Sequence, residues 1–423
     1  MAGRIRLLLI WFFIAGVQAQ AQYADSVFPK PDSGYGADGP YLVDRIGMVD
    51  PYFPGEEIEV FYPNGVSTPV PTIFFCHGFG GTFSYYVYGL WQFLASKGYA
   101  FVFAPYPTTG ASIQERYDIL LASFRLAARS HPEIIDTTQV GFIGHSFGGG
   151  AMFGVSKHCF TENQWGEDGR FLFSLAPWYA YDLSPEALTG FPTDVKLIMQ
   201  VYDQDVLNDH RIAIDLFNHI GIPEAEKDYI MVRSDTIGSV PYLAEHGLPG
   251  TYQDFNALDY YALYRLVDAL ADYTFNGSEE GRVVALGHGD PAQVSMPPGL
   301  SSLVESTDPQ PIYGEEHYEF PCSALLNPRR NFCGSTTAID QIVPRTFRLK
   351  ITPNPAREEV QINLPAGDRD RWLAIYDLHG LLVLRRKVNS GWEMVTIDVS
   401  DWPEQTYLIR IGSAFGKMTV LRP

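Results

Sequence analysis

The hydrophobic pattern divides the chain into regions, with changes near residues 55, 275 and 345. Between residues 55 and 275, short apolar runs alternate with longer stretches of helical periodicity. Most of the apolar runs are continuous, which is typical of parallel strands that are buried on both faces. Strands that alternate with helices predict right-handed crossovers. The pattern therefore predicts an α/β domain in which helices cover both faces of a mostly parallel sheet.

The expected strands of this domain are 58–62, 72–76, 100–104, 140–143, 171–176, 196–202 and 228–233. The expected helices are 85–96, 114–130, 149–156, 209–220 and 257–273. Residues 22–55 are rich in Pro, Gly and Tyr, and residues 276–344 contain clusters of Gly, Pro and Ser. We expect both of these segments to be irregular, and residues 22–344 to form one domain with its core at about 55–275.

After residue 344 the pattern changes to short β segments separated by turns. These segments are 347–351, 360–364, 372–376, 381–387, 394–399, 407–411 and 417–421. Such closely spaced short strands predict a small β-sandwich domain at 345–423. The net charge changes at the same place from strongly negative to slightly positive. Residues 22–344 carry 16 basic and 40 acidic side chains, whereas residues 345–423 carry 12 basic and 9 acidic ones.

The acidic main region, in a chain of net charge −19, argues against nucleic-acid binding, which needs a cationic face. At the N-terminus, Arg4 and Arg6 precede an apolar run that is shorter than the roughly 20 residues needed to span a bilayer. Small residues follow this run at Ala19 and Ala21. We expect residues 1–21 to be a signal peptide and the protein to be secreted or attached to the cell surface; a short membrane anchor is the alternative.

Export implies an oxidising destination, in which cysteines pair. Cys322 and Cys333 lie close together in a Pro-rich stretch, and we expect them to form a disulfide. Cys76 and Cys159 lie in apolar surroundings and are expected to be free, buried thiols. No Cys/His spacing resembles a zinc site, so we expect neither a metal nor a cofactor.

The most informative stretch is Gly144-His145-Ser146-Phe147-Gly148, which follows an apolar strand and precedes a helix. This is the context of a nucleophile elbow, a strained turn that holds a reactive serine at the tip of a strand. Glycines two before and two after the serine let the strand and the helix approach closely. The following helix directs its N-terminal amides at developing negative charge. We therefore predict Ser146 as a nucleophile; a Gly-rich structural turn is the alternative.

A nucleophilic serine needs an acid that orients its base, and in this architecture the acid follows the serine in the chain. The acid is expected just beyond strand 196–202, where Asp203 and Asp205 lie. We prefer Asp205, because its place beyond the strand end leaves room to turn inward. Asp203 is the rival, and Asp209 is a third candidate that also fits a turn or a helix N-cap.

The base is expected after the last strand and before the last helix, in the segment 234–256. His246 is the histidine of that segment, and His288, which follows the final helix, is its rival. His77 and His145 flank the catalytic loops, and we expect them to be structural.

An oxyanion hole needs two backbone N–H donors. One is expected from Phe147, directly after the nucleophile. The other is expected from the loop His77-Gly78-Phe79-Gly80-Gly81, which follows strand 72–76. Phe79 is the preferred donor in this loop and Gly80 the alternative.

These residues resemble the α/β-hydrolase family over about 55–275, and within it the cutinase, dienelactone-hydrolase and chlorophyllase-like carboxylesterases. The matching stretches are His77-Gly78-Phe79-Gly80, Leu94-Ala95-Ser96-Lys97-Gly98-Tyr99, Val140-Gly141-Phe142-Ile143-Gly144-His145-Ser146 and Leu175-Ala176-Pro177-Trp178. The last stretch resembles polyester hydrolases, which implies that Trp178 lines the substrate cleft; a core aromatic is the alternative. Phe147 replaces the usual Met, and Tyr202 stands where Gly is common. Tyr85 and Tyr86 are further candidates for the cleft wall.

Residues 345–423 resemble the sorting domain of the Por (type IX) secretion route. The matching stretches are Pro353-Asn354-Pro355, Asp377-Leu378-His379-Gly380 and Lys417-Met418-Thr419-Val420, whereas Gln405 replaces a usual Gly. The resemblance implies that the secretion machinery is a partner and that the domain is cleaved or anchored during export. A carbohydrate- or protein-binding module is the alternative.

Together these features predict a secreted serine carboxylesterase that acts through an acyl-enzyme, with aromatic or polymeric (polyester or cutin-like) esters among its candidate substrates. A serine peptidase on the same fold is one alternative. A non-catalytic secreted binding protein on a hydrolase scaffold is another.

Overall fold

The computed structural model describes residues 22–67, 69–251, 254–314, 349–364, 371–376, 382–411 and 414–422, together with 318, 322, 327 and 329–333. The predicted signal peptide and the predicted domain boundary at 344/345 lie outside these residues, as does the motif at 377–380. Among the helices of the described residues, none has both the length and the apolar character required to traverse a bilayer.

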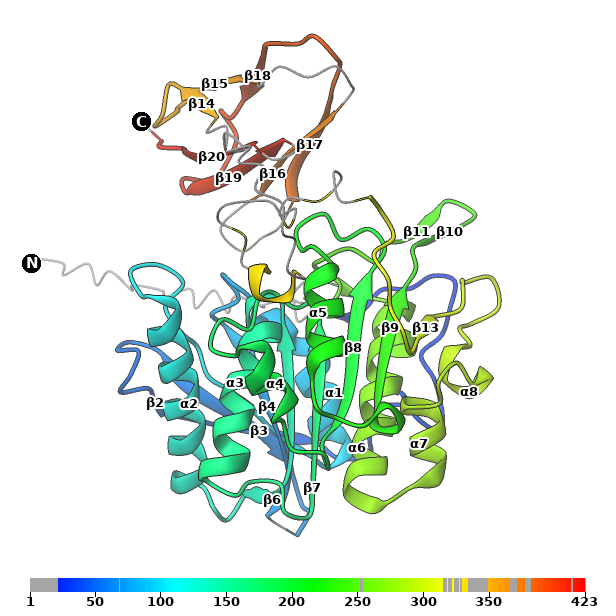
Figure 1. The fold of residues 1–423 in the computed structure, drawn as a ribbon. Coiled ribbons are helices and arrows are strands. Elements are labelled where there is room, and N and C mark those ends of the chain that lie inside the picture. The colour runs from blue at the N-terminus through cyan, green and yellow to red at the C-terminus, as the bar shows by residue number, and fades with distance from the viewer. Residues whose placement is uncertain are drawn as a thin grey trace, which may run out of the picture.

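A nine-stranded sheet forms the centre of the larger domain in the described residues, with the order β13-β9-β8-β7-β6-β4-β5-β3-β2 (Figure 1). Neighbouring strands in the run β5-β4-β6-β7-β8-β9 are parallel. The pairs nearer the two edges, β2·β3, β3·β5 and β13·β9, are antiparallel. The predicted α/β architecture with a mostly parallel sheet is confirmed. The strands are β2 (Val43–Val49), β3 (Glu57–Pro63), β4 (Val70–Cys76), β5 (Ala100–Phe103), β6 (Ile135–His145), β7 (Gly169–Leu175), β8 (Lys196–Tyr202), β9 (Lys227–Val232) and β13 (Val304–Ser306).

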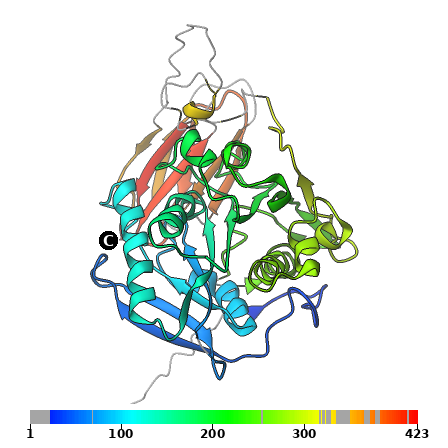
Figure 2. The ribbon, with the colours of Figure 1, turned by 60° about the horizontal axis from the view of Figure 1, so that its bottom comes forward.

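Helices cover both faces of this sheet, as the view along the sheet in Figure 2 shows. Side chains of one strand alternate between the faces, so that Phe74 packs in the core with α2, α3 and α5, and Ile73 packs in the core with α1, α6 and α7. The helices are η1 (Ser84–Val87), α1 (Tyr88–Lys97), α2 (Ile113–Ser130), α3 (Phe147–Glu162), α4 (Pro185–Thr189), α5 (Arg211–His219), η2 (Glu224–Glu226), η3 (Asp259–Tyr264), α6 (Arg265–Asn276), α7 (Glu279–Ala285), α8 (Pro291–Val294) and η5 (Arg330–Phe332).

Both segments that were expected to be irregular contribute regular structure, so this expectation was wrong. In 22–55, β1 (Gln22–Tyr23) pairs with β12 (Asp254–Phe255), and β2 forms the outer edge of the sheet. In 276–344, α7 and α8 pack beside α6, and β13 adds to β9. β2 exposes one face to solvent and only half-buries the other, and β13 has three residues, so neither has the apolar run by which a buried strand is found. A short hairpin joins β10 (Asp235–Ile237) to β11 (Val240–Tyr242).

The predicted disulfide between Cys322 and Cys333 is present, with an S–S distance of 2.08 Å. Cys76 and Cys159 are buried and free. Burial raises the pKa of both thiols, so that they remain protonated apolar groups.

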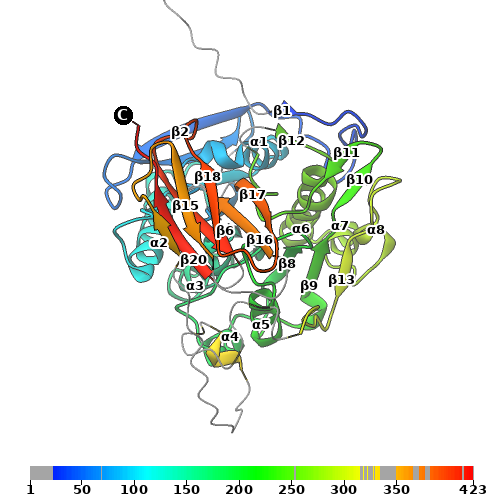
Figure 3. The same ribbon diagram turned by 90° about the horizontal axis from the view of Figure 1, so that it is seen from above.

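The C-terminal region folds into two antiparallel sheets, of order β14-β15-β18 and β17-β16-β19-β20 in the described residues. They share one core, which contains Val360 from the first sheet and Ile375 from the second and is separate from both cores of the larger domain. Figures 1 and 3 show these strands lying over the carboxyl ends of the parallel strands. The strands are β14 (Lys350–Thr352), β15 (Glu359–Asn363), β16 (Arg371–Tyr376), β17 (Leu382–Val388), β18 (Met394–Asp398), β19 (Thr406–Ile411) and β20 (Ala414–Thr419).

Candidate active site

Ser146 lies in a sharp turn between β6 and α3, with φ 55° and ψ −121°. A non-glycine residue in this left-handed region is strained. A Cβ atom on Gly144 would lie 2.3 Å from the carbonyl oxygen of Gly148, and a Cβ atom on Gly148 would lie 1.9 Å from that of Cys76. The two glycines therefore allow the strand, the helix and the neighbouring strand β4 to approach so closely that Ser146 is held at the tip of β6.

The structure brings Ser146, His246 and Asp205 into one hydrogen-bonded chain. Nε2 of His246 lies 2.9 Å from Oγ of Ser146, and Nδ1 of the same ring lies 2.8 Å from Oδ2 of Asp205. Asp205 comes from the loop after β8, and His246 from the loop after β11. Three loops that are distant in sequence thus converge at the carboxyl end of the sheet, where α/β sheets place their ligands.

The Asp205 carboxylate is held in its charged form. Burial alone would raise its pKa, but the charge and hydrogen bond of His246, together with the backbone N–H groups of Asn208 and Leu207, lower the pKa below its usual value. An ionised Asp205 accepts a hydrogen bond from the Nδ1–H group of His246. This fixes the tautomer that leaves Nε2 free to accept a proton from Ser146.

The rival acids make other contacts. Asp203 accepts hydrogen bonds from the backbone N–H and the hydroxyl of Ser234, at 3.0 and 2.7 Å. Asp209 forms an ion pair with the buried Arg211, at 2.6 Å. Both carboxylates therefore stabilise loops, and neither is bonded to His246 in the described residues.

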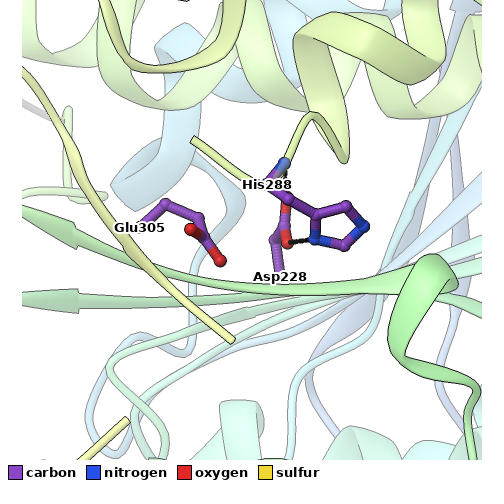
Figure 4. A group of neighbouring side chains, drawn as sticks. All are labelled: Asp228, His288 and Glu305. Carbon is purple, nitrogen blue, oxygen red and sulfur yellow. Dashed lines mark hydrogen bonds and ion pairs between the residues drawn. The ribbon is translucent and has the colours of Figure 1, made fainter. Parts of the chain in front are cut away.

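The rival base His288 lies far from Ser146, near the amino end of β9, where it pairs with Asp228 (Figure 4). Its Nδ1 is 2.6 Å from Oδ1 of Asp228, and Glu305 completes a group whose ligand atoms lie within 4.8 Å of one another. His, Asp and Glu together can ligate a cation. Here the other oxygen of the Asp228 carboxylate accepts hydrogen bonds from the backbone N–H of His288 and from the side-chain amide of Gln293.

His77 and His145 hold the loop that follows β4 and the loop that carries His246. Burial lowers the pKa of each to about 3, so that both rings are neutral. A neutral His145 donates from Nε2 to the backbone carbonyl of His246, at 2.8 Å. His77 donates from Nδ1 to the carbonyl of Gly78, accepts from the Tyr106 N–H and stacks on the Tyr106 ring at 3.9 Å. Each ring thus fixes the backbone of one loop.

The two expected oxyanion donors flank the serine. Phe147 is the first residue of α3, and Phe79 lies in the loop after β4, where Gly81 N–H donates to the carbonyl of Gly78. Phe79 and Phe147 both line the cavity that contains Ser146, whereas Gly80 does not. The guanidinium of Arg116 lies over both phenyl rings, at 5.3 and 5.5 Å from their centroids, which places a positive charge beside this part of the cavity.

This cavity has a volume of about 480 Å³, a size that suits a small organic ligand. Tyr86 and Trp178 line it, and the Trp178 indole N–H donates to the hydroxyl of Tyr181 at 3.0 Å. The expectation for Tyr85 was wrong, because Tyr85 lines a separate groove beside α1. Tyr85 and Tyr86 are adjacent in η1, so their side chains point in different directions.

Several lining residues escaped the sequence analysis. Arg116, Tyr181 and Leu207 come from segments without a recognisable motif. The C-terminal domain also contributes Tyr376, Leu408, Ile409, Arg410 and Gly416. No periodicity within either domain signals that the two share a cavity.

Comparison with protein families identifies the C-terminal region. Residues 350–420 match the family model of the secretion system C-terminal sorting domain. This region is a Por secretion sorting domain. The sorting domain marks proteins of the type IX route, with whose machinery it interacts, so the protein is released from the cell or attached to its surface. A search of curated proteins found no match to the chain.

Proposed function

We propose that the protein is a secreted serine carboxylesterase of the α/β-hydrolase family. The hydrogen-bonded chain Asp205–His246–Ser146, at a strained turn on the wall of a cavity, carries this proposal. The parallel sheet and the position of the three loops at its carboxyl edge support the same family. The identity of these groups and their order along the chain are those that acyl transfer requires.

In this mechanism, Oγ of Ser146 attacks the ester carbonyl carbon while its proton passes to Nε2 of His246. Asp205 stabilises the resulting imidazolium, and the N–H groups of Phe79 and Phe147 donate to the carbonyl oxygen as it gains negative charge. The bond to the alcohol then breaks, and His246 returns the proton to the departing oxygen. Water, deprotonated by His246, releases the acid and restores Ser146.

The lining of the cavity indicates the class of ester. Phe79, Phe147, Trp178 and Tyr181 present aromatic surface beside Ser146, and apolar atoms dominate the wall. Aromatic walls favour apolar or aromatic acyl groups, since burial of such groups is favourable. We therefore propose apolar and aromatic esters as substrates, with polyester or cutin-like chains among them.

The test is turnover of p-nitrophenyl acetate and labelling by a fluorophosphonate probe. The wild-type chain is expected to hydrolyse the ester and to take up the probe, and Ser146→Ala is expected to do neither. Ser302→Ala, at an exposed serine outside the cavity, is the matched control and should behave as the wild type. Labelling that persists in Ser146→Ala contradicts the assignment. Faster turnover of the matching p-nitroanilide than of the ester would favour a peptidase instead.

A further inference from the structure

The cavity that contains Ser146 is closed on one side by the sorting domain. In Figure 3, which looks down on the carboxyl ends of the parallel strands, the sorting domain lies over β6 and β8. Tyr376 from β16 and Leu408 and Arg410 from β19 line the same cavity as Ser146 and His246. The walls of the catalytic cavity thus belong to two domains.

Strand geometry explains which side chains of the sorting domain meet the cavity. Along β19, Tyr407 and Ile409 are buried in the core of the sorting domain, whereas the alternate residues Leu408 and Arg410 lie on the opposite face of the sheet. Leu408 is directly opposite Tyr376 in the neighbouring strand. The outer face of this sheet therefore presents Tyr376, Leu408 and Arg410 together, as one patch.

A direct hydrogen bond joins this patch to the catalytic machinery. The guanidinium of Arg410 donates from Nη1 to the backbone carbonyl of Val206, at 2.7 Å. Val206 directly follows Asp205, so the contact falls on the loop that carries the catalytic acid. This hydrogen bond and the shared cavity wall hold the sorting domain in position over the site.

Tyr376 adds a hydroxyl group to a wall in which apolar atoms dominate. Its side chain is 5% exposed, and its hydroxyl has no hydrogen-bond partner in the described residues. A buried hydroxyl without a partner costs free energy. In the docked arrangement the Tyr376 hydroxyl therefore lacks a hydrogen-bond partner, and this cost opposes docking of the sorting domain over the cavity.

The sorting domain can leave this position as a unit. Its core is separate from both cores of the larger domain, so undocking exposes the patch without opening any core. The type IX machinery interacts with this same domain. The position of the sorting domain during export therefore affects how substrates reach Ser146.

We propose that the docked sorting domain is a size filter for the esterase, and this inference rests on the proposed function. With the domain docked, the site accepts small, soluble esters that fit a cavity of about 480 Å³. Undocking removes Tyr376, Leu408 and Arg410 from the wall and opens the cleft to bulky esters, such as segments of a polyester chain. The intact chain is accordingly selective for small esters.

The test introduces a charge into the docking patch of the full-length chain. Leu408→Glu places a carboxylate in the patch, beside the acidic loop that contains Asp205. Met394→Glu is the matched control, because Met394 is exposed to a similar extent (47% against 43% for Leu408), lies on β18 of the other sheet and does not line the cavity. Arg410→Ala removes the hydrogen bond to Val206 as a second, independent disruption.

The readout is the ratio of kcat/KM for a linear ethylene terephthalate trimer to kcat/KM for p-nitrophenyl acetate. Leu408→Glu and Arg410→Ala are expected to raise this ratio by about tenfold, as a shift of about 1.4 kcal/mol in the docking equilibrium would. Met394→Glu should leave it unchanged. Hydrogen exchange of the backbone around Val206 should also increase in both patch variants but not in the control.

The possible failures are distinguishable. Turnover of p-nitrophenyl acetate with the same ratio in all variants overturns the size filter and leaves the esterase intact. A ratio that rises equally in Met394→Glu also overturns it, because the effect would then come from loosening the sorting domain in general. Absence of turnover and of fluorophosphonate labelling in every variant overturns the proposed function itself, and the size filter with it.

Discussion

The neutral ring of His145 donates a hydrogen bond from Nε2 to the backbone carbonyl of His246, at 2.8 Å. His145 directly precedes Ser146, the proposed nucleophile, and His246 is the proposed base. One hydrogen bond therefore ties the loop of the base to the turn of the serine. Because burial lowers the pKa of His145 to about 3, this donor stays neutral over the whole pH range in which the base would act.

We predict that His145→Leu lowers kcat for p-nitrophenyl acetate by about 10²-fold with little change in KM, because a small displacement of His246 disturbs proton transfer more than binding. His145→Gln, which keeps an N–H donor, should recover part of the loss. Steady-state kinetics of the two variants check this. Equal losses in both would show that the size and shape of the ring matter, and the hydrogen bond does not.

The choice between the two neighbouring aspartates gives a second prediction. Asp205→Asn keeps the shape of the acid but leaves His246 without a charged partner, so we expect kcat to fall by about 10⁴-fold, as in other serine triads. Asp203→Asn should leave kcat nearly unchanged and should instead lower the free energy of unfolding by about 1 kcal/mol, since Asp203 holds Ser234. Kinetics and urea unfolding separate the two residues. A larger kinetic loss in Asp203→Asn would reverse the assignment.

Local sequence determines much of the candidate site. The apolar strand before Gly144 and the glycines two residues before and two residues after Ser146 are enough to predict the turn, because backbone approach at these glycines excludes any larger residue. The order of acid and base follows from the strand–helix alternation. The structure then places Asp205 and His246 on the loops at which the order of elements had put them.

Other features depend on contacts that leave no local pattern. Tyr85 and Tyr86 have the same side chain and adjacent positions, and only the docking of η1 decides which of them meets the cavity. The edge strands β2 and β13 are held by pairing with a neighbour, since their own apolar periodicity is weak. Leu408 and Tyr376 reach the cavity that contains Ser146 through the packing of one domain on another, which neither domain encodes in its own periodicity.

The lowered pKa of His145 gives a prediction for the pH dependence of stability. The folded state keeps this ring neutral down to about pH 3, whereas the unfolded chain protonates it near the ordinary histidine pKa of 6.5. The stability that depends on the neutral ring is therefore present above pH 6.5 and is lost as the pH falls from 6.5 toward 3. Burial raises the pKa values of Asp182 and Asp259 to about 6 and 7, and these groups change the stability in the opposite direction. The pH dependence of the wild-type stability alone therefore does not show the contribution of His145.

The difference in unfolding free energy between the wild type and His145→Leu isolates the contribution of His145, because both proteins contain Asp182 and Asp259. We predict that the loss of unfolding free energy caused by His145→Leu is smaller at pH 5 than at pH 7.5, by about 2 kcal/mol. Urea unfolding at the two pH values measures this difference. A loss that is independent of pH would mean that His145 takes up a proton as readily in the folded protein as in the unfolded chain.

The close approach at Gly148 predicts a severe effect of a single methyl group. In Gly148→Ala the new Cβ would lie 1.9 Å from the Cys76 carbonyl, which belongs to the backbone of a central strand and cannot move aside cheaply. We expect a loss of about 1–3 kcal/mol in unfolding free energy together with loss of ester turnover, since the turn that carries Ser146 must shift. Gly190→Ala is the control, because its new Cβ would meet nothing closer than 3.7 Å and its φ is −84°. It should change neither stability nor turnover.

The disulfide and a buried ion pair hold one loop against α5. Arg329 lies between Cys322 and Cys333 in sequence and binds Asp215 of α5 at 2.5 and 3.0 Å. Replacing both cysteines by serine should lower the unfolding free energy by about 3 kcal/mol, as expected for a loop of this size. Arg329→Met should cost about 3–5 kcal/mol, because it leaves the Asp215 carboxylate without its partner.

Because the two interactions secure the same loop, their losses should not add. Once the cysteines are replaced, the loop is freer to leave α5, and part of the energy of the ion pair is already lost. We therefore predict that the variant with all three substitutions loses less stability than the sum of the separate losses, by about 1 kcal/mol or more. Urea unfolding of the wild type and the three variants completes this cycle. Additive losses would mean that the ion pair forms equally well without the disulfide, and that the loop is positioned by its packing on α5.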